Sequence, residues 1–206
     1  MILQSNNTLI KHLVNQLRNS QTNFAEFRTI IAQIAKLLCA QALENIPTIE
    51  KNIPTWQGDL KCHFIKESDL VCIPILRAGE PMLNGILELL PKSVGGFLAM
   101  KRDEQTAVSK IYYQRFPNLN NKTVILLDPM VATGGSLIDA ISVIKEQNPK
   151  EIICLNILGS TFGVDAVDAT HPDIKMYIAQ IDEELDENKY IRPGLGDAGD
   201  RAFNTL

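Results

Sequence analysis

The sequence predicts an α/β protein with an open, mainly parallel sheet and helices on both faces of that sheet. Apolar strand-like segments recur, and the first is apolar without alternation, as a strand buried on both faces should be. They lie at Leu70–Leu76, 94–100, 124–127, 151–158 and 174–181. Helical apolar spacing occurs between most of them, at 82–90, 137–144 and 163–169. Strands that alternate with helices form parallel βαβ units.

A single domain accounts for the whole chain. Its 206 residues suffice for one α/β domain with a sizeable core, and no internal repeat divides them. We expect the domain to cover 1–206, with the core at about 68–181 and a C-terminal loop at about 182–206.

Two helices are predicted before the first core strand. Thr8–Arg18 has apolar residues at helical spacing, and a stronger pattern runs over residues 27–38. Asn23, with a glutamate three residues later, resembles a capping box, and Pro47 marks the end of the second helix. We expect these helices to cover the sheet or a subunit interface.

Shorter elements are predicted on either side of the first core strands. The pattern between Thr48 and Ile65 indicates a hairpin with a turn at Gly58-Asp59. Residues 103–109 are polar without an apolar period, which predicts a mobile loop that could close over a charged substrate. An extended segment follows at 111–116, and a turn at 117–121.

Composition is that of an ordinary soluble globular protein. Hydrophobic residues make up 45% and charged residues 21%, and the net charge of −4 does not indicate a broad nucleic-acid footprint. No apolar run approaches membrane-spanning length, and the polar N-terminus is not a signal peptide. We therefore expect a cytoplasmic protein that binds neither nucleic acid nor membranes.

Cysteines and histidines form no metal-binding motif in the sequence. The cysteines lie in separate predicted helices and strands, without CxxC spacing, at Cys39, Cys62, Cys72 and Cys154. We expect reduced, buried thiols. The histidines, His12, His63 and His171, are far apart, so we expect three unrelated surface or loop residues.

The most informative stretch is Val124–Ser136. An apolar run ends in Asp128, passes through a turn of small residues and leads into a helical pattern. Gly134 and Gly135 remove Cβ atoms that would block an anion, and Thr133 to Ser136 can direct backbone N–H groups and hydroxyls toward it. Open α/β sheets place their ligands at such strand ends. A plain turn is the alternative, and neither a Walker A loop nor a dinucleotide fingerprint is present.

Two strands are predicted to deliver basic residues to one edge of the sheet. Arg77 follows the strand that ends at Leu76, and Lys101 and Arg102 follow the strand that ends at Met100. The planar guanidinium contacts phosphate oxygens through two nitrogens, which suits a pyrophosphate. An arginine that caps a surface turn explains Arg77 alone equally well, but two such strands favour phosphate binding.

The C-terminal segment has two contrasting parts. Asp182–Glu187 contains five acids in six residues, which predicts a solvated loop. Tyr190–Arg201 contains three glycines interleaved with aliphatic and aromatic residues. A flexible tail does not need such apolar residues, so we expect a folded loop whose backbone contacts a ligand.

Four motifs resemble those of the uracil phosphoribosyltransferase family, which has the type I phosphoribosyltransferase fold. They are ILRAG at 75–79, KRD at 101–103, DPMVATGGS at 128–136 and PGLGDAGDR at 193–201, and the similarity extends from about Phe24 to the end. The resemblance implies conversion of uracil and 5-phosphoribosyl 1-pyrophosphate to uridine monophosphate (UMP) and pyrophosphate, in pyrimidine salvage. It also implies Mg²⁺ as cofactor, a homodimer or larger homo-oligomer, and GTP as a candidate effector.

The resemblance also assigns roles to individual residues. It makes Arg77, Arg102 and Asp128 the catalytic residues, with both arginines on the pyrophosphate. The phosphoribosyl pyrophosphate site comprises Arg77, Arg102, Asp128, Pro129, Met130, Val131, Ala132, Thr133, Gly134, Gly135, Ser136 and Asp197. The uracil site comprises Ile191, Gly196, Asp197 and Ala198. Magnesium is expected to be held through substrate and water, with Asp197 as one candidate protein ligand.

A glycine-rich loop suits uracil for a chemical reason. Uracil has two carbonyl acceptors that flank an N–H donor, and backbone groups can pair with that edge where side chains stay out of the way. Gly194, Gly196 and Gly199 allow such an approach. Cytosine would leave buried polar groups unpaired, so fixed amide groups would discriminate between the two bases.

The chain departs from the family pattern at three places. Glu80-Pro81 stands where many members have Leu-Gly, Arg192 replaces an aliphatic residue beside the base pocket, and Gly159–Phe162 has no functional explanation. An inward-pointing Arg192 side chain would alter the choice of base. Two alternatives therefore remain open: a phosphoribosyltransferase for another base, and a non-catalytic nucleotide-sensing relative.

Overall fold

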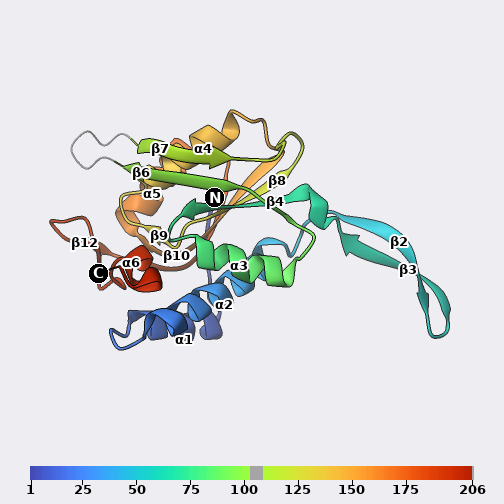
Figure 1. Cartoon of the computed structure of the whole chain (residues 1–206), viewed down its shortest axis with the longest axis horizontal. Helices are drawn as coiled ribbons and strands as arrows, with labels where there is room; N and C mark the ends of the chain where they lie inside the picture. The colour runs from blue at the N-terminus through green and yellow to red at the C-terminus, as the bar shows by residue number, and fades with distance from the viewer. Residues whose placement is uncertain (103–108, 206) are drawn as a thin grey trace.

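The computed structural model describes residues 1–102 and 109–205, and a twisted sheet forms its centre (Figure 1). Within these residues the sheet has nine strands, and every strand pair is parallel except β6 with β7. The spatial order is β1 (Ile2–Gln4), β11 (Lys175–Asp182), β10 (Glu151–Ser160), β8 (Thr123–Leu127), β4 (Leu70–Leu76), β6 (Phe97–Arg102) and β7 (Ser109–Arg115). Beside this path, β5 (Val94–Gly95) pairs with β4, and β9 (Met130–Val131) pairs with β10. The predicted mainly parallel sheet is confirmed.

Helices cover both faces of the sheet, as predicted. One face carries α1 (Thr8–Arg18), α2 (Phe24–Ala42) and α3 (Glu80–Leu89), and the other carries α4 (Gly135–Lys145) and α5 (Thr161–Thr170). Strand β8 contributes to both cores, because Ile125 and Leu127 pack with the first set of helices and Leu126 with the second. Burial on both faces explains why the strand sequence is apolar without alternation.

The first two helices begin where their sequences predict. Asn7 caps α1 and Asn23 caps α2, and the Asn23 Oδ1 accepts from Ala25 N and Glu26 N at 3.0 Å. Helix α2 ends at Ala42, before Pro47, so the proline lies outside the helix rather than terminating it.

A long hairpin extends away from the body of the molecule (Figure 1). It consists of β2 (Thr48–Thr55) and β3 (Gly58–Ile65), which confirms the predicted hairpin. Its turn lies at Trp56-Gln57 rather than at Gly58-Asp59, because Thr55 pairs with Gly58. The Thr55 hydroxyl donates to the Gly58 carbonyl at 2.6 Å and closes the turn two residues earlier than predicted.

Other boundaries differ where tertiary contacts decide them. Strand β1 has no strand pattern of its own and forms by pairing with β11. The predicted strand at 94–100 is split at Gly96, whose N–H donates to the Cys72 carbonyl at 2.9 Å. A short 3-10 turn, η1 (Glu67–Asp69), precedes β4. Residues 103–108, which make up most of the predicted mobile loop, lie outside the described residues.

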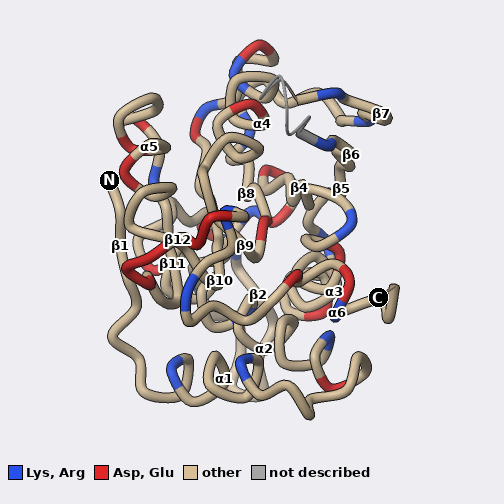
Figure 2. The backbone as a smooth tube through the Cα atoms, turned by 90° about the vertical axis from the view of Figure 1, so that its left-hand side faces the viewer, with Lys and Arg blue, Asp and Glu red and all other residues tan. Residues whose placement is uncertain are grey.

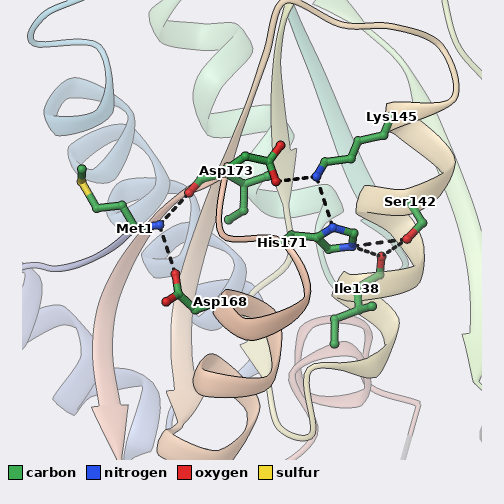
Figure 3. Close-up of polar contacts among 8 residues, drawn as sticks. Met1, Ile138, Ser142, Lys145, Asp168, His171 and Asp173 are labelled. Atoms are coloured by element: carbon green, nitrogen blue, oxygen red, sulfur yellow. Dashed lines mark hydrogen bonds and ion pairs between the residues drawn. The ribbon is translucent and has the colours of Figure 1, made fainter.

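The three histidines are surface or loop residues, as expected, and His171 is a loop residue that is buried among polar partners (Figure 3). His171 follows α5 and is 7% exposed, whereas the other two are exposed. Its Nε2 lies 3.1 Å from the Ile138 carbonyl oxygen, and its Nδ1 lies 3.2 Å from Lys145 Nζ. Lys145 also pairs with Asp173 at 2.6 Å. The network joins α4 to the segment between α5 and β11, so His171 has a structural role.

The chain ends in a small C-terminal lobe formed by β12 (Glu184–Leu185), β13 (Ile191–Arg192) and α6 (Ala198–Phe203). The acidic stretch that enters it is drawn in red beside β12 in Figure 2. The sequence predicted a solvated loop here, but part of this stretch is buried. Asp182 is 5% exposed, and its two carboxylate oxygens accept from Arg18 of α1 at 2.7 and 2.8 Å. A buried carboxylate needs such a partner, and this pair attaches the end of β11, from which the chain enters the lobe, to α1.

Three of the four thiols agree with the prediction of buried cysteines, whereas Cys62, in β3 of the hairpin, is only partly buried. All four cysteines are free, and Cys39, Cys72 and Cys154 are buried. Burial raises the pKa of the Cys72 thiol to about 11, which makes it unreactive. Among the residues that the structure describes, no helix combines the length and apolar character needed to cross a bilayer.

Candidate active site

The turns after β4 and β8 and the C-terminal lobe gather at the edge where the parallel strands end (Figure 1). Arg77 directly follows β4, Asp128 directly follows β8, and Asp197 caps α6. Open α/β sheets bind their ligands at this edge. The structure therefore places most of the sequence-predicted residues where ligands bind in such folds.

Glycine shapes the turn after β4. A Cβ atom at Gly79 would lie 2.4 Å from the Leu127 carbonyl oxygen, so only glycine lets this turn approach the end of β8. The Gly79 N–H donates to the Ile75 carbonyl at 2.9 Å. The peptide bond between Leu76 and Arg77 is cis. The turn thus lies against β8, the strand that leads into the predicted phosphate-binding residues 128–136.

The Arg77 guanidinium is held by the C-terminal lobe and is still accessible. Its Nη2 donates to Asp200 Oδ1 at 2.9 Å and its Nη1 to Thr205 Oγ1 at 3.0 Å. The side chain is 56% exposed. Arg102 ends β6, and the parallel register of Leu76 with Ala99 carries its backbone to the same edge. The Arg102 side chain lies outside the described part of the chain.

The predicted phosphate loop, residues 128–136 and called the phosphate loop below, combines a short strand with a helix start that has no capping side chain. Met130 and Val131 form β9 and pair with Leu158 and Gly159. Gly134 caps α4 with a left-handed φ of 78°, and no side chain occupies the cap. The N–H groups of the first turn of α4 are therefore left to water or to an anion.

Asp128 is a buried carboxyl group at the start of this loop. It is 8% exposed, and burial raises its pKa to about 7 although the Met130 N–H donates to Oδ1 at 3.3 Å. The Asn156 side chain donates to the Asp128 backbone carbonyl at 2.7 Å and fixes the end of β8. At neutral pH this carboxyl group can both donate and accept hydrogen bonds, which suits contact with hydroxyl groups.

Residues at the start of α5 pack against the phosphate loop and hold its shape. The buried Ser160 hydroxyl donates to the Ala132 carbonyl at 2.6 Å and accepts from the Gly163 N–H at 2.9 Å. A Cβ atom at Gly134 would lie 2.5 Å from the Gly163 carbonyl oxygen, and one at Gly163 would lie 2.2 Å from the Ala132 carbonyl oxygen. Ser160, from the segment 159–162 that had no functional explanation in the sequence, and the neighbouring Gly163 thus fix the shape of this loop.

The glycine-rich segment of the C-terminal lobe is folded, as predicted. Ile191, Leu195 and Ala198 are buried in the same core as α1 and α2. Gly194 and Gly196 have left-handed φ values of 62° and 80°, which favour glycine. The Gly194 N–H donates to the carboxylate of Asp182 at 3.0 Å, and its carbonyl accepts from Arg18 at 2.7 Å.

Residues 196–198 lead directly into α6. The Asp197 side chain accepts from the Asp200 N–H at 2.8 Å and caps the helix. The sequence placed Asp197 in the site but did not indicate three residues that support the site. These are Asp200, which contacts Asp197, Thr205, which contacts Asp200, and Ser160, which contacts the phosphate loop. Asp200 lies inside the glycine-rich motif, so the motif contained its position but not its contact.

Comparison with known proteins agrees with this geometry. The sequence model of the family described as "Uracil phosphoribosyltransferase" matches residues 4–205. The chain belongs to the uracil phosphoribosyltransferase family. A uracil phosphoribosyltransferase of Fervidobacterium nodosum is 42% identical over 206 residues, covering 100% of both chains. That of Thermosipho melanesiensis is 42% identical over 198 residues, covering 96% of this chain and 95% of the relative.

Comparison with solved structures identifies the fold. The AQ2163 protein from Aquifex aeolicus has a TM-score of 0.95 at 36% identity, covering 98% of both chains. A purine phosphoribosyltransferase from Pyrococcus horikoshii has a TM-score of 0.52 at 16% identity, covering 74% of this chain and 84% of the other. The second likeness concerns the fold alone, and it confirms the type I phosphoribosyltransferase fold.

Two departures from the uracil phosphoribosyltransferase pattern have simple structural settings. Pro81 lies in the first turn of α3, where its missing N–H costs no helical hydrogen bond. Arg192 is directed toward Asp186, with its Nε donating at 2.8 Å, and its side chain is 62% exposed. The guanidinium is thus engaged at the surface of the lobe rather than in a buried pocket.

Proposed function

We propose that the chain catalyses transfer of the phosphoribosyl group of 5-phosphoribosyl 1-pyrophosphate to uracil, giving UMP and pyrophosphate, in pyrimidine salvage. The family match over residues 4–205 is the observation that carries the proposal. The meeting of an arginine turn, a phosphate loop and a glycine-rich lobe at one sheet edge supports it.

The chemistry assigned to the site is positioning and charge stabilisation. Uracil N1 attacks ribose C1 as the bond from C1 to the pyrophosphate oxygen breaks. The pyrophosphate leaves with the bonding electrons, and the proton on uracil N1 is released to water. Arg77 and Arg102 stabilise the charge that develops on this leaving group. The amides and hydroxyls of Thr133 to Ser136 hold the remote 5-phosphate, which fixes C1 for attack.

Asp128 is assigned to the ribose and the lobe to uracil. The buried Asp128 carboxyl group is placed to hydrogen-bond the ribose hydroxyls. Backbone groups of Ile191 and of 196–198 are assigned to the polar edge of uracil, and the folded glycine loop supports a fixed orientation of these amides. The outward direction of Arg192 supports uracil as the base.

Magnesium fits the site as an ion carried largely by substrate and water. Within the described residues, no cluster of three His, Cys, Asp or Glu side chains forms a protein metal site. One Asp197 oxygen caps α6, which leaves the other for a metal or a hydroxyl group. Mg²⁺ commonly binds through substrate phosphates and retained waters, and when bound it neutralises charge on the pyrophosphate.

A homodimer or larger homo-oligomer, a cytoplasmic location and GTP as an effector complete the proposal. The hairpin supports self-association, because it projects from the body and exposes Trp56 to 91% and Leu60 to 54%. Four free cysteines support a reducing compartment. Light scattering of the protein as it elutes from a size-exclusion column measures the mass of the assembly. The mass of a single chain would exclude the proposed homo-oligomer.

The reaction is tested by UMP and pyrophosphate formation with 5-phosphoribosyl 1-pyrophosphate, Mg²⁺ and each of uracil, cytosine and hypoxanthine. We expect product with uracil only, and the assay repeated with GTP tests activation.

Arg77→Ala and Asp128→Asn should each lower turnover severely without unfolding the protein. Absence of product with every base, despite binding of 5-phosphoribosyl 1-pyrophosphate, would instead indicate a nucleotide-sensing relative.

A further inference from the structure

Three side chains at the interface of the β4 turn and α6 form a closed polar triangle. Arg77 donates to Asp200 Oδ1 at 2.9 Å and to Thr205 Oγ1 at 3.0 Å, and the Thr205 hydroxyl donates to the same Asp200 oxygen at 2.6 Å. The hydrogen bonds from Thr205 and Arg77 hold the pKa of Asp200 below its usual range. The triangle therefore contains a charged carboxylate facing a charged guanidinium.

The triangle orients Arg77 without using up its donors. A guanidinium has five N–H groups, and the contacts with Asp200 and Thr205 use two of them. Each terminal nitrogen keeps one N–H, and Nε keeps its own. Three donors with a fixed direction thus remain for phosphate oxygens, whereas a free arginine side chain would have to be ordered on binding.

Helix α6 lies between the residues assigned to uracil and the arginine assigned to pyrophosphate. Asp197, at its N-terminal cap, accepts from the Asp200 N–H at 2.8 Å. A Cβ atom at Gly199 would lie 3.8 Å from Arg77 Nη2 and 3.8 Å from the Ala78 Cβ, so α6 lies against the β4 turn. The residues assigned to uracil and the arginine assigned to pyrophosphate are therefore joined through about one turn of helix.

We propose that Asp200, assisted by Thr205, is a positioning residue that orients Arg77 for the pyrophosphate and couples it to the uracil loop. The proposal rests on the assignment of Arg77 to the pyrophosphate under the proposed function. Asp200 acts only through the guanidinium, so its effect should disappear when the guanidinium is absent. It should also be confined to ligands that contain the pyrophosphate group.

The test is a double-mutant cycle measured by calorimetric binding in the presence of Mg²⁺, which needs no turnover. Asp200→Ala should weaken binding of 5-phosphoribosyl 1-pyrophosphate about tenfold in the otherwise native protein, and less than about twofold in the Arg77→Ala background. Ribose 5-phosphate, which lacks the pyrophosphate, should bind the native protein and Asp200→Ala with affinities within about twofold. Thr205→Val removes the second partner and should give a smaller effect of the same kind.

Controls separate positioning from general damage. Asp173→Ala removes an exposed carboxylate that pairs with Lys145 away from the site, and should leave both affinities unchanged. Three outcomes would overturn the proposal. The first is that Asp200→Ala weakens the binding of both ligands equally. The second is that it weakens binding of 5-phosphoribosyl 1-pyrophosphate by the same factor in the native protein and in Arg77→Ala. The third is that it leaves the binding of 5-phosphoribosyl 1-pyrophosphate unchanged. If Asp200→Ala does not fold, the cycle between Thr205→Val and Arg77→Ala decides in the same way. Lack of UMP formation by the native protein would overturn the proposed function alone, because the binding cycle is read independently.

Discussion

The Asp128 carboxyl group shows how the burial of one residue affects both stability and chemistry. Its pKa rises from the ordinary 3.8 to about 7 because the charged form loses its hydration, and the hydrogen bond from the Met130 N–H offsets only part of that loss. The folded protein therefore keeps this proton to a higher pH than the unfolded chain does. Between about pH 4 and pH 7 the contribution of Asp128 to stability falls as the pH rises.

Asp128→Asn should remove this pH dependence, because the amide is neutral at every pH and can still accept from Met130. A shift of about three pKa units corresponds to about 4 kcal/mol as an upper bound. We expect the variant to gain stability relative to the native protein on going from pH 5 to pH 8. Urea unfolding of both proteins at the two pH values measures the difference, in which other titrating groups cancel. A difference that is the same at both pH values would contradict the buried ionisation.

Individual residues were predictable where the signal is local. Asp128 and Gly134 lie within one continuous motif, and a strand end followed by a glycine turn identifies both. The contact between Arg77 and Asp200 joins residues 123 positions apart, and that between Arg18 and Asp182 joins residues 164 positions apart. No sequence pattern pairs such residues, which is why the acidic run around Asp182 suggested a solvated loop.

At the scale of elements, the phosphate loop depends on the neighbouring β10 to α5 connection. Ser160 both caps α5 and binds the Ala132 carbonyl, so the loop and the helix share one hydroxyl group. The close approach of Gly134 and Gly163 leaves the loop little freedom to move toward α5. The loop is thus preorganised for an anion before one binds, which reduces the entropy lost on binding.

Ser160→Ala should therefore lower stability and substrate affinity together. Loss of the cap costs about 1 kcal/mol, and the freed loop should raise KM for 5-phosphoribosyl 1-pyrophosphate severalfold. Asn23→Ala is a matched control, because it removes the cap of α2, whose side chain accepts from two backbone N–H groups. It should cost similar stability and leave KM unchanged. If both variants changed KM to the same extent, the effect would be one of stability alone.

Elements were predictable in proportion to their length and periodicity. The boundaries of α1 match the prediction because apolar spacing and a polar flank both mark them. Strand β1 has only three residues, and the break at Gly96 depends on a hydrogen bond to Cys72, so neither leaves a periodic signal. The Trp56-Gln57 turn follows from the side chain of Thr55, whereas glycine alone suggested a later position.

For the whole molecule, arginines attach the C-terminal lobe to the first two helices. Arg18 of α1 binds Asp182 and the Gly194 carbonyl, and Arg28 of α2 donates to the Ala202 carbonyl at 2.7 Å. Arg201 donates to the Asn19 carbonyl at 2.7 Å. The lobe has a short helix and two very short strands, so its position depends on these contacts more than on its own secondary structure.

Arg18→Met should therefore destabilise the protein by about 3–5 kcal/mol, because it leaves the buried Asp182 carboxylate without its partner. It should also raise KM for uracil more than KM for 5-phosphoribosyl 1-pyrophosphate, since Arg18 and Asp182 together hold Gly194. The double variant Arg18→Met/Asp182→Asn should recover much of the stability, because no unpaired charge remains and the amide oxygen can still accept from the Gly194 N–H.

Lys36→Met provides the comparison for this prediction. It removes an ion pair between α2 and α3 whose Glu88 side chain is 70% exposed, and such pairs contribute below about 1 kcal/mol. Urea unfolding of the four proteins gives the stability differences, and uracil titrations give KM. A cost for Arg18→Met no larger than that for Lys36→Met would show that the lobe is held by its apolar contacts. A large cost that Asp182→Asn reverses would assign the attachment to the buried charge pair.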